Sequence, residues 1–513
     1  MSNNAKVDQR KQGWSDRFLS VVERVGNKLP HPVILFFIFA GIVVLLSFIL
    51  NKIGLTVQHP GTGETISVVN LLSKDGIRRI LMEAVDNFTG FAPLGTVLVA
   101  MLGVGVAERS GLIGAMLKKM VLGAPSKLIT AVVVFAGVMS SMAADAGYVV
   151  LVPLGAIIFA AKGRHPLAGL AAAFAGVSGG FSSNLLVTLI DPLLGGISTE
   201  AAQLYDASYS VLPTANYFFM IASTFVVTVA GTFVTERIVE PRLGEYTGKY
   251  KQDLEPITEN ESKALKSAVL ALAAYIGVLL IMLVPENGWL RSDAGNILQG
   301  IPFTPFVASM VLLIALLFLI PGVAFGFSSG KIKNTKQIAE FMGDSMSTMG
   351  GYIVLAFAAA QFVAYFNWTH IGMVMAVKGA EFLSAINLTG IPLLLVFIIV
   401  CGFINIFIGS ASAKWAIMAP VFIPMLMELG YSPEIGQLAY RIGDSTTNII
   451  SPLMSYFAII VAFAKKYDKN IGIGTLISTM LPYSIVFLIV WMIMLTIWLL
   501  LGFPIGPNAP ILY

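Results

Sequence analysis

Long apolar segments follow one another along almost the whole chain and are separated by short polar stretches. A helix that crosses a bilayer needs about 20 mostly apolar residues. Segments that approach or exceed this length are residues 32–50, 92–107, 166–190, 217–235, 268–283, 305–325, 353–366, 435–463 and 482–501. The pattern therefore predicts about nine transmembrane helices, which is the number of these segments.

Two further apolar stretches, 128–161 and 391–427, are each interrupted in the middle by small polar residues. The interruptions read MSSMAADAG at 139–147 and IGSASAKW at 408–415. A turn at membrane depth is tolerated only where protein or a water-filled cavity surrounds it. We therefore predict two re-entrant helical hairpins, each of which enters and leaves the membrane on the same side.

The two halves of the chain also resemble each other. A shift of 267 positions places prolines on prolines and an aromatic residue on another: Pro153 on Pro420, Pro166 on Pro433 and Tyr148 on Trp415. After a slip of three residues, SSNLL at 182–186 falls on TTNII at 446–450. Five predicted spans separate the hairpins, so the second hairpin opens on the opposite face. Inverted repeats with broken helices that meet near the midplane are typical of secondary transporters.

The predicted fold class is thus an all-α polytopic membrane protein with two inverted repeats. Its parts are an N-terminal segment, a first span with an external loop, a first repeat, a connection with two linking spans, and a second repeat. Their bounds are 1–30, 31–79, 80–240, 241–335 and 336–513.

Composition supports a membrane protein and excludes one large soluble core. The chain has 513 residues, of which 57% are hydrophobic and 12% charged, whereas soluble proteins carry about 25% charged residues. The single cysteine, Cys401, has no disulfide partner. The net charge of +4 gives no sign of nucleic-acid binding. The first thirty residues lack the apolar stretch and cleavage site of a removable signal peptide.

The positions of the basic residues predict the orientation in a bacterial inner membrane. With a cytoplasmic N-terminus, 24 of the 32 Lys and Arg residues fall on cytoplasmic segments and six on external ones. The remaining two, Lys414 and Arg441, lie within apolar stretches. This bias follows the positive-inside rule.

The two aligned motifs, SSN with Asn184 and TTN with Asn448, are candidates for a cation site. Glycines before the first motif and Pro452 after the second loosen the helices and free carbonyl oxygens. Together with amide and hydroxyl oxygens, these groups suit a desolvated Na⁺, although coupling to H⁺ is also compatible. The alternative is that the motifs only hold helices together, as small polar residues commonly do in membranes. The sequence indicates no organic cofactor.

Arg441 and Asp444 are the most informative charges, because a charge in mid-bilayer is costly and usually pairs or functions. Three residues apart on one helix, they can pair with each other. Alternatively, Asp444 belongs to the cation site and Arg441 binds an anionic substrate through two N–H groups. Both interpretations are open at this stage.

Several further residues are weaker candidates for the cation site or the substrate site. Asn405 is another candidate oxygen ligand for the cation, and Trp415 either stacks on an aromatic ligand or packs in the core. Asp145, Asp191 and Lys414 are less favoured candidates.

The sequence argues against an enzyme. GVSGG at 176–180 matches the G-x-S-x-G motif of serine hydrolases but follows no strand. The four histidines fall in predicted loops or at helix ends, so no base lies at matching depth. A Walker A motif is also absent, which argues against an ATP-driven pump.

Five runs resemble the AbgT-type aminobenzoyl-glutamate transporter family: NFTGFAPLG at 87–95, GRHPLAG at 163–169, IGSASAKW at 408–415, YRIGDS at 440–445 and GFPIGP at 502–507. The resemblance covers nearly the whole chain and is strongest, at FAGVSGG (174–180), to members that export antimetabolites. It implies a homodimer of the ion-transporter superfamily fold, with nine spans and two hairpins per subunit.

The family includes importers of p-aminobenzoyl-glutamate and exporters of p-aminobenzoate and sulfonamides. The resemblance places on the substrate path Asp191, Ser412, Trp415, Pro433, Arg441, Asp444 and Pro452, and on the cation Asn405 and Asp444. The amide groups of Asn184 and Asn448 are further candidates for binding the substrate. The expected function is ion-coupled transport of these small aromatic anions across the bilayer. A gated channel of the same architecture is the alternative.

Overall fold

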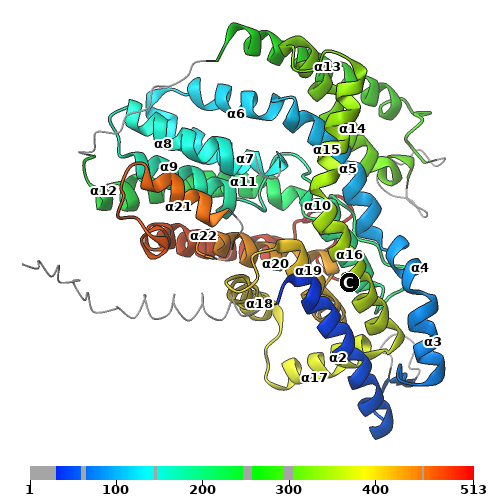
Figure 1. Ribbon diagram of the computed structural model, residues 1–513. Coiled ribbons are helices and arrows are strands. Elements are labelled where there is room, and N and C mark those ends of the chain that lie inside the picture. Colours follow the sequence, from blue (N-terminus) through cyan, green and yellow to red (C-terminus); the bar gives the residue numbers. More distant parts are fainter. Residues whose placement is uncertain are drawn as a thin grey trace, which may run out of the picture.

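The computed structural model describes residues 30–58, 65–143, 147–246, 257–292, 304–452, 454 and 456–513, and the described chain is predominantly helical (Figure 1). Segment 1–29 and Asp145 at the tip of the first hairpin lie outside these residues. The fold class is confirmed as an all-α membrane protein.

The helices of the first half begin with a membrane-length helix and continue through shorter pieces. They are α2 (Pro32–Ile53), α3 (Lys74–Met82), α4 (Ala84–Thr89), α5 (Ala92–Arg109), α6 (Leu112–Leu122), α7 (Ile129–Ser140), α8 (Val152–Ala161), α9 (Pro166–Phe174), α10 (Ile190–Ala202), α11 (Tyr217–Val234) and α12 (Glu240–Leu243). Short 3₁₀ turns (Ser126–Leu128, Ser141–Ala143) and π-helical turns (Gly147–Leu151, Ala175–Gly179, Thr235–Val239) adjoin them. Strands β1 (Thr56–Gln58) and β2 (Thr65–Ser67) form a small antiparallel hairpin that pairs Val57 with Ile66.

The second half contains longer helices. They are α13 (Glu259–Leu283), α14 (Pro305–Ser329), α15 (Thr335–Thr348), α16 (Gly350–Trp368), α17 (Ile371–Ala385), α18 (Gly390–Asn405), α19 (Ala411–Glu428), α20 (Pro433–Asn448), α21 (Phe457–Lys465) and α22 (Ile473–Leu501). In Figure 1, α13 lies at one edge of the molecule and α17 toward the opposite edge.

Within the described residues, six helices are long and apolar enough to cross a membrane, and two bent pairs raise the number to eight. The pairs are α5 with α6, bent by 58°, and α17 with α18, bent by 118°. Sequence patterning missed α6, α15, α17 and the β-hairpin. The reason is that these elements are short, or carry too many polar residues to look like spans.

Two predicted spans, 166–190 and 435–463, are interrupted at the SSN and TTN motifs, where the glycines and Pro452 predict loosened helices. The first is helical through α9 and the π-helical turn Ala175–Gly179, is unwound after Gly180, and resumes at α10. The second is helical through α20, which ends at Asn448, and becomes helical again at Phe457, where α21 begins. The apolar run continues across both breaks, so hydrophobicity alone conceals them.

Both arms of each predicted hairpin pack against the broken helix that follows. α7 and α8 contact α9, and α18 and α19 contact α20. Glycines permit the close approach: a Cβ on Gly176 would lie 2.4 Å from the carbonyl oxygen of Val134, and one on Gly443 would lie 2.4 Å from that of Ile398. The shift of 267 positions places Gly176 on Gly443, so the same contact geometry occurs in both halves.

Ion pairs connect segments that the charge distribution places on the same side. Arg109 pairs with Asp344 at 3.2 Å, and Arg164 donates through Nε to Glu240 at 2.9 Å. On the other side, the hydroxyl of Tyr205 donates to Glu428 at 2.8 Å. These two ion pairs and one hydrogen bond join loops that the sequence predicts on a common side, and which side is cytoplasmic stays a prediction.

Candidate functional site

Helix α20 lies at the centre of the molecule and is unusual in being both polar and buried (Figure 1). All sixteen of its residues are buried, including Glu434, Gln437, Arg441 and Asp444. Its start is defined by Ser432, whose side chain accepts from the amide of Ile435. Because burying unpaired charge is costly, these side chains must find partners on neighbouring elements.

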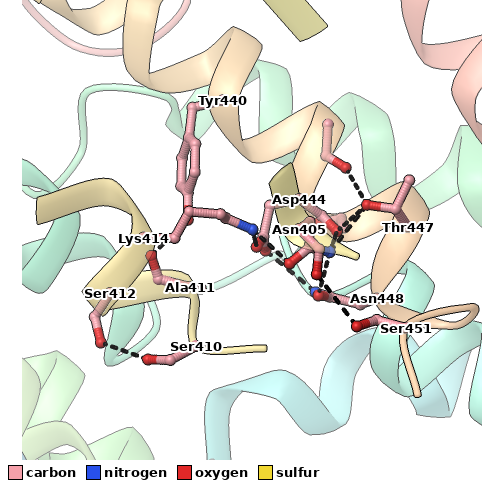
Figure 2. Close-up of polar contacts among 12 residues, drawn as sticks. Asn405, Ser410, Ala411, Ser412, Lys414, Tyr440, Asp444, Thr447, Asn448 and Ser451 are labelled. Carbon is pink, nitrogen blue, oxygen red and sulfur yellow. Dashed lines mark hydrogen bonds and ion pairs between the residues drawn. The ribbon is translucent and has the colours of Figure 1, made fainter. Parts of the chain in front are cut away.

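Asp444 is held in a cluster with Lys414 and Asn405, which approach from α19 and α18 (Figure 2). The Lys414 ammonium lies 2.5 Å from Asp444 Oδ1 and 2.5 Å from Asn405 Oδ1. The side chains of Lys414 and Asp444 are 0% and 2% exposed. Lys414, a less favoured candidate in the sequence, is therefore the cationic partner of Asp444.

The amide groups of Asn405 and Asn448 complete this cluster. Asn405 Nδ2 lies 2.8 Å from the Asp444 carbonyl oxygen, 2.9 Å from Thr447 Oγ1 and 2.8 Å from Asn448 Oδ1. Asn448 Nδ2 donates to Asp444 Oδ2 at 3.1 Å. The predicted proximity of Asn405, Asp444 and Asn448 is present in the structure.

Arg441 pairs with Asp191 rather than with Asp444. Its Nη1 donates to Asp191 Oδ1 at 2.6 Å, and both side chains are almost fully buried. Asp191 Oδ2 accepts from the amide and the hydroxyl of Thr188, at 2.5 and 2.9 Å. The Arg441–Asp444 pair considered from the sequence is therefore wrong, since both charges are satisfied by residues on other elements.

The other two nitrogen atoms of the Arg441 guanidinium do not take part in the ion pair with Asp191. Nε and Nη2 are buried and have no hydrogen-bond partner among the residues that the structure describes. An unsatisfied buried donor carries a desolvation cost, so this face of the guanidinium is a candidate for binding an external acceptor.

Trp415 is part of the packed core around α20. Its ring is 0% exposed and stacks on Tyr440 with centroids 4.4 Å apart. Its indole N–H donates to Ser198 Oγ at 3.0 Å, and Ser198 in turn donates to Gln437 at 2.6 Å. The structure thus shows the core-packing geometry for Trp415, and its predicted role on the substrate path stays a prediction.

The motif of the first half lies in the unwound segment between α9 and α10. Asn184 Nδ2 donates to Ser141 Oγ at 3.0 Å, and its oxygen accepts from the amide of Leu186. Ser183 is fully buried, and within the described part of the chain its hydroxyl lacks a hydrogen-bond partner. The amide of Ser182 donates to Ser445 Oγ at 3.1 Å, which joins this segment to α20.

A cavity of about 330 Å³ opens where the two hairpin tips meet the two breaks. It is lined by residues of both halves: Val97, Met101, Ser141, Tyr148, Phe181, Leu189, Ile190, Leu193, Met349, Tyr352, Gly409, Ala411, Asn448, Met454 and Tyr456. Tyr148 and Tyr456 stack with centroids 4.5 Å apart and planes 5° from parallel. Ligand sites in proteins span about 300–1,000 Å³, so this cavity suits a small molecule.

The other predicted residues lie around this centre at different distances. Ser412 is on the first turn of α19, with its hydroxyl 3.5 Å from that of Ser410. Pro452 follows Ser451 in the break after α20, and the Ser451 hydroxyl donates to the Asn405 carbonyl oxygen. Pro433 begins α20, eleven residues before Asp444, or about 16 Å along the helix. Sequence reasoning missed the stacked tyrosines, since only their proximity in space marks them.

Comparison with known proteins identifies the relatives of this chain. The profile of the AbgT putative transporter family matches residues 17–513. The p-aminobenzoyl-glutamate transport protein of Escherichia coli K12 is 38% identical over 494 residues, which are 96% of this chain and 97% of that protein.

Two solved structures have nearly the same fold. One is the YdaH transporter of Alcanivorax borkumensis, described as having an unusual topology, with 47% identity and a TM-score of 0.89 over 93% of this chain and all of that one. The other is MtrF of Neisseria gonorrhoeae, described with a class of antimetabolite efflux pumps, with 51% identity and a TM-score of 0.90 over 96% of this chain and all of that one. The chain therefore belongs to the AbgT transporter family, as its motifs indicate.

Proposed function

We propose that this protein is an ion-coupled secondary transporter of p-aminobenzoyl-type anions such as p-aminobenzoyl-glutamate and p-aminobenzoate. We propose further that it exports related antimetabolites, including sulfonamides. The described activities of the Escherichia coli and Neisseria relatives support this substrate class.

The observation that carries the proposal is the composition of the cavity wall. Both hairpin tips (Ser141, Ala411) and both broken segments (Phe181, Asn448) contribute to one cavity. A transporter that alternates access by moving one repeat against the other needs its substrate held where the repeats meet. We propose accordingly that the two halves are inverted repeats with re-entrant hairpins.

The chemistry of the cavity fits an aromatic anion. Apolar walls and the stacked Tyr148–Tyr456 pair offer flat surfaces for an aromatic ring. Asn448 and Ser141 supply polar groups for an amine or an amide. Arg441 is buried and is not one of the residues that line the cavity. We propose that its unpartnered N–H groups meet the substrate carboxylate in another state of the transport cycle.

Coupling of substrate transport to an ion gradient requires a site that binds the ion, and we propose the two Asn motifs for this role. The coupling ion is Na⁺ or H⁺, and the candidate groups are Asn184 with Ser183 in the first half and Asn405, Asp444 and Asn448 in the second. We also propose a homodimer in the bacterial inner membrane with a cytoplasmic N-terminus.

A counterflow experiment tests the transporter against the channel. Proteoliposomes loaded with unlabelled p-aminobenzoate should take up external radiolabelled p-aminobenzoate faster, and transiently above equilibrium, because a carrier exchanges one molecule for another. Uptake that is unaffected by internal substrate and does not saturate would instead identify a gated channel.

A further inference from the structure

The Lys414 ammonium supplies a positive charge to the cluster of Asn405, Asp444 and Asn448 in the second half. Lys414 extends from the first turn of α19 and directs its ammonium between α18 and α20 (Figure 2). Three groups surround it: Asp444 Oδ1 and Asn405 Oδ1, each at 2.5 Å, and the ring of Tyr440, whose centroid is 5.2 Å away. Carboxylate and amide oxygens are also the groups that would coordinate a free Na⁺.

Each side-chain oxygen of this cluster already accepts from a donor of the protein itself. Asn405 Oδ1 and Asp444 Oδ1 face the ammonium. The remaining side-chain oxygens accept from amide groups, Asp444 Oδ2 from Asn448 and both Thr447 Oγ1 and Asn448 Oδ1 from Asn405. A Na⁺ bound at these oxygens would have to displace hydrogen bonds of the cluster. It would also lie beside the Lys414 ammonium, and the two cations would share the single carboxylate of Asp444.

The charged pair has no counterpart in the first half. The shift of 267 positions places Asn405 on Val138, Lys414 on Gly147 and Asp444 on Val177. Val177 is buried, and a Cβ on Gly147 would lie 2.1 Å from Ser140 Oγ. At the positions that this shift aligns, the first half therefore carries neither the ammonium nor the carboxylate, as expected for a cation and its ligand.

We propose that the Lys414 ammonium is a tethered cation that takes the place of a free Na⁺ at the Asn405–Asp444–Asn448 cluster. The second half then binds no Na⁺ while Lys414 is present, and removal of this side chain opens a Na⁺ site. The inference rests on the proposed function in treating this cluster as a cation position and narrows that function: a coupling Na⁺ would bind at the Asn184 motif of the first half and not here.

Thermal unfolding of the purified full chain in NaCl and in choline chloride at equal ionic strength measures Na⁺ binding without transport. Lys414→Ser removes the ammonium and leaves a small hydroxyl in its place. Lys378→Ser is the matched control, because it removes a lysine from an exposed pair with Glu381. The double variant Lys414→Ser with Asp444→Asn removes the carboxylate that would hold the Na⁺.

Lys414→Ser should gain a Na⁺-specific rise in Tm of several degrees over the wild type and over Lys378→Ser. The double variant should lose this gain. A Lys414→Ser variant destabilised equally in both salts would overturn the proposal and leave a purely structural ion pair.

A second measurement keeps the proposal testable if Lys414→Ser does not fold. The difference in Tm between NaCl and choline chloride is measured for the wild type and for Asn405→Ala, which keeps the charges of Lys414 and Asp444. This difference, whether zero or positive, should be the same in both proteins. A wild-type shift that Asn405→Ala abolishes would place Na⁺ beside Lys414 and contradict the proposal. Because binding is measured, a transporter of a different substrate would leave this result standing.

Discussion

Arg441 on α20 donates a hydrogen bond to Asp191 on α10 at 2.6 Å, across 250 residues of sequence. The pair joins the broken helix of the second half to the segment that follows the break in the first half. One side of the guanidinium is thereby fixed, and Nε and Nη2 are left for another acceptor. This relationship leads to a test that separates structural from substrate-binding roles.

Arg441→Met should destabilise the protein by about 3–5 kcal/mol, because it leaves the Asp191 carboxylate buried without its partner. Adding Asp191→Leu should restore much of the stability, yet transport should stay absent because the donors for the substrate carboxylate are gone. Thermal unfolding and p-aminobenzoate flux on the same preparations measure both effects. A folded double variant with near-normal flux would remove Arg441 from the substrate site.

Trp415→Ala should cost about 3–5 kcal/mol of stability, as expected for truncation of a buried aromatic side chain. Trp415→Phe should cost only about 1 kcal/mol, since it keeps the stacking on Tyr440 and loses the hydrogen bond to Ser198. Flux of Trp415→Phe should show a nearly unchanged KM. A KM raised tenfold at unchanged Tm would indicate direct contact between Trp415 and the substrate.

Tyr148→Leu should weaken the binding of aromatic substrates, because it removes half of the stacked pair in the cavity wall. Aromatic contacts contribute about 0.5–1.5 kcal/mol, so KM should rise by up to about tenfold. Tyr148→Phe is the control and should retain most of the affinity. Equal behaviour of the Leu and Phe variants toward p-aminobenzoate would show that the ring does not contact the substrate.

Gly443→Ala should destabilise the contact between α18 and α20 by about 1–3 kcal/mol, because the new Cβ would overlap the Ile398 carbonyl oxygen. Gly41→Ala on α2 is the matched control, since nothing lies within 4 Å of its Cβ position. That control should be neutral or slightly stabilising, as in an ordinary helix. Indistinguishable melting temperatures for the two variants would argue against close packing at Gly443.

Much of the architecture is visible in the sequence, because apolar run length and small polar interruptions report directly on membrane helices and on turns between them. The proximity of Asn405, Asp444 and Asn448 could also be predicted, Asn448 from the motif that aligns between the halves, and Asn405 and Asp444 from the family resemblance. The ion-pair partners of Arg441 and Asp444 could not be predicted. Arg441 and Asp444 are three residues apart and suit a local pair, whereas their partners Asp191 and Lys414 come from other elements whose packing is a tertiary property.

The glycines before the SSN motif and Pro452 after the TTN motif predict the breaks, but the extent of the unwound segments could not be predicted. Residues 180–189 are nearly as apolar as the helices around them, so hydropathy continues where the backbone unwinds. The unwinding depends on hairpin side chains such as Ser141, which bonds to Asn184. The cavity and its stacked tyrosines follow from the same tertiary contacts.

The most direct test of the central claim is accumulation of radiolabelled p-aminobenzoate and p-aminobenzoyl-glutamate in proteoliposomes that start with equal substrate on both sides. Na⁺ and pH gradients are imposed separately, and empty liposomes are the control. An ion-coupled transporter predicts net movement of at least one substrate against its own gradient, driven by one of the two ion gradients and lost when an ionophore collapses it. Substrate that remains at equal concentration under both gradients would contradict ion-coupled transport.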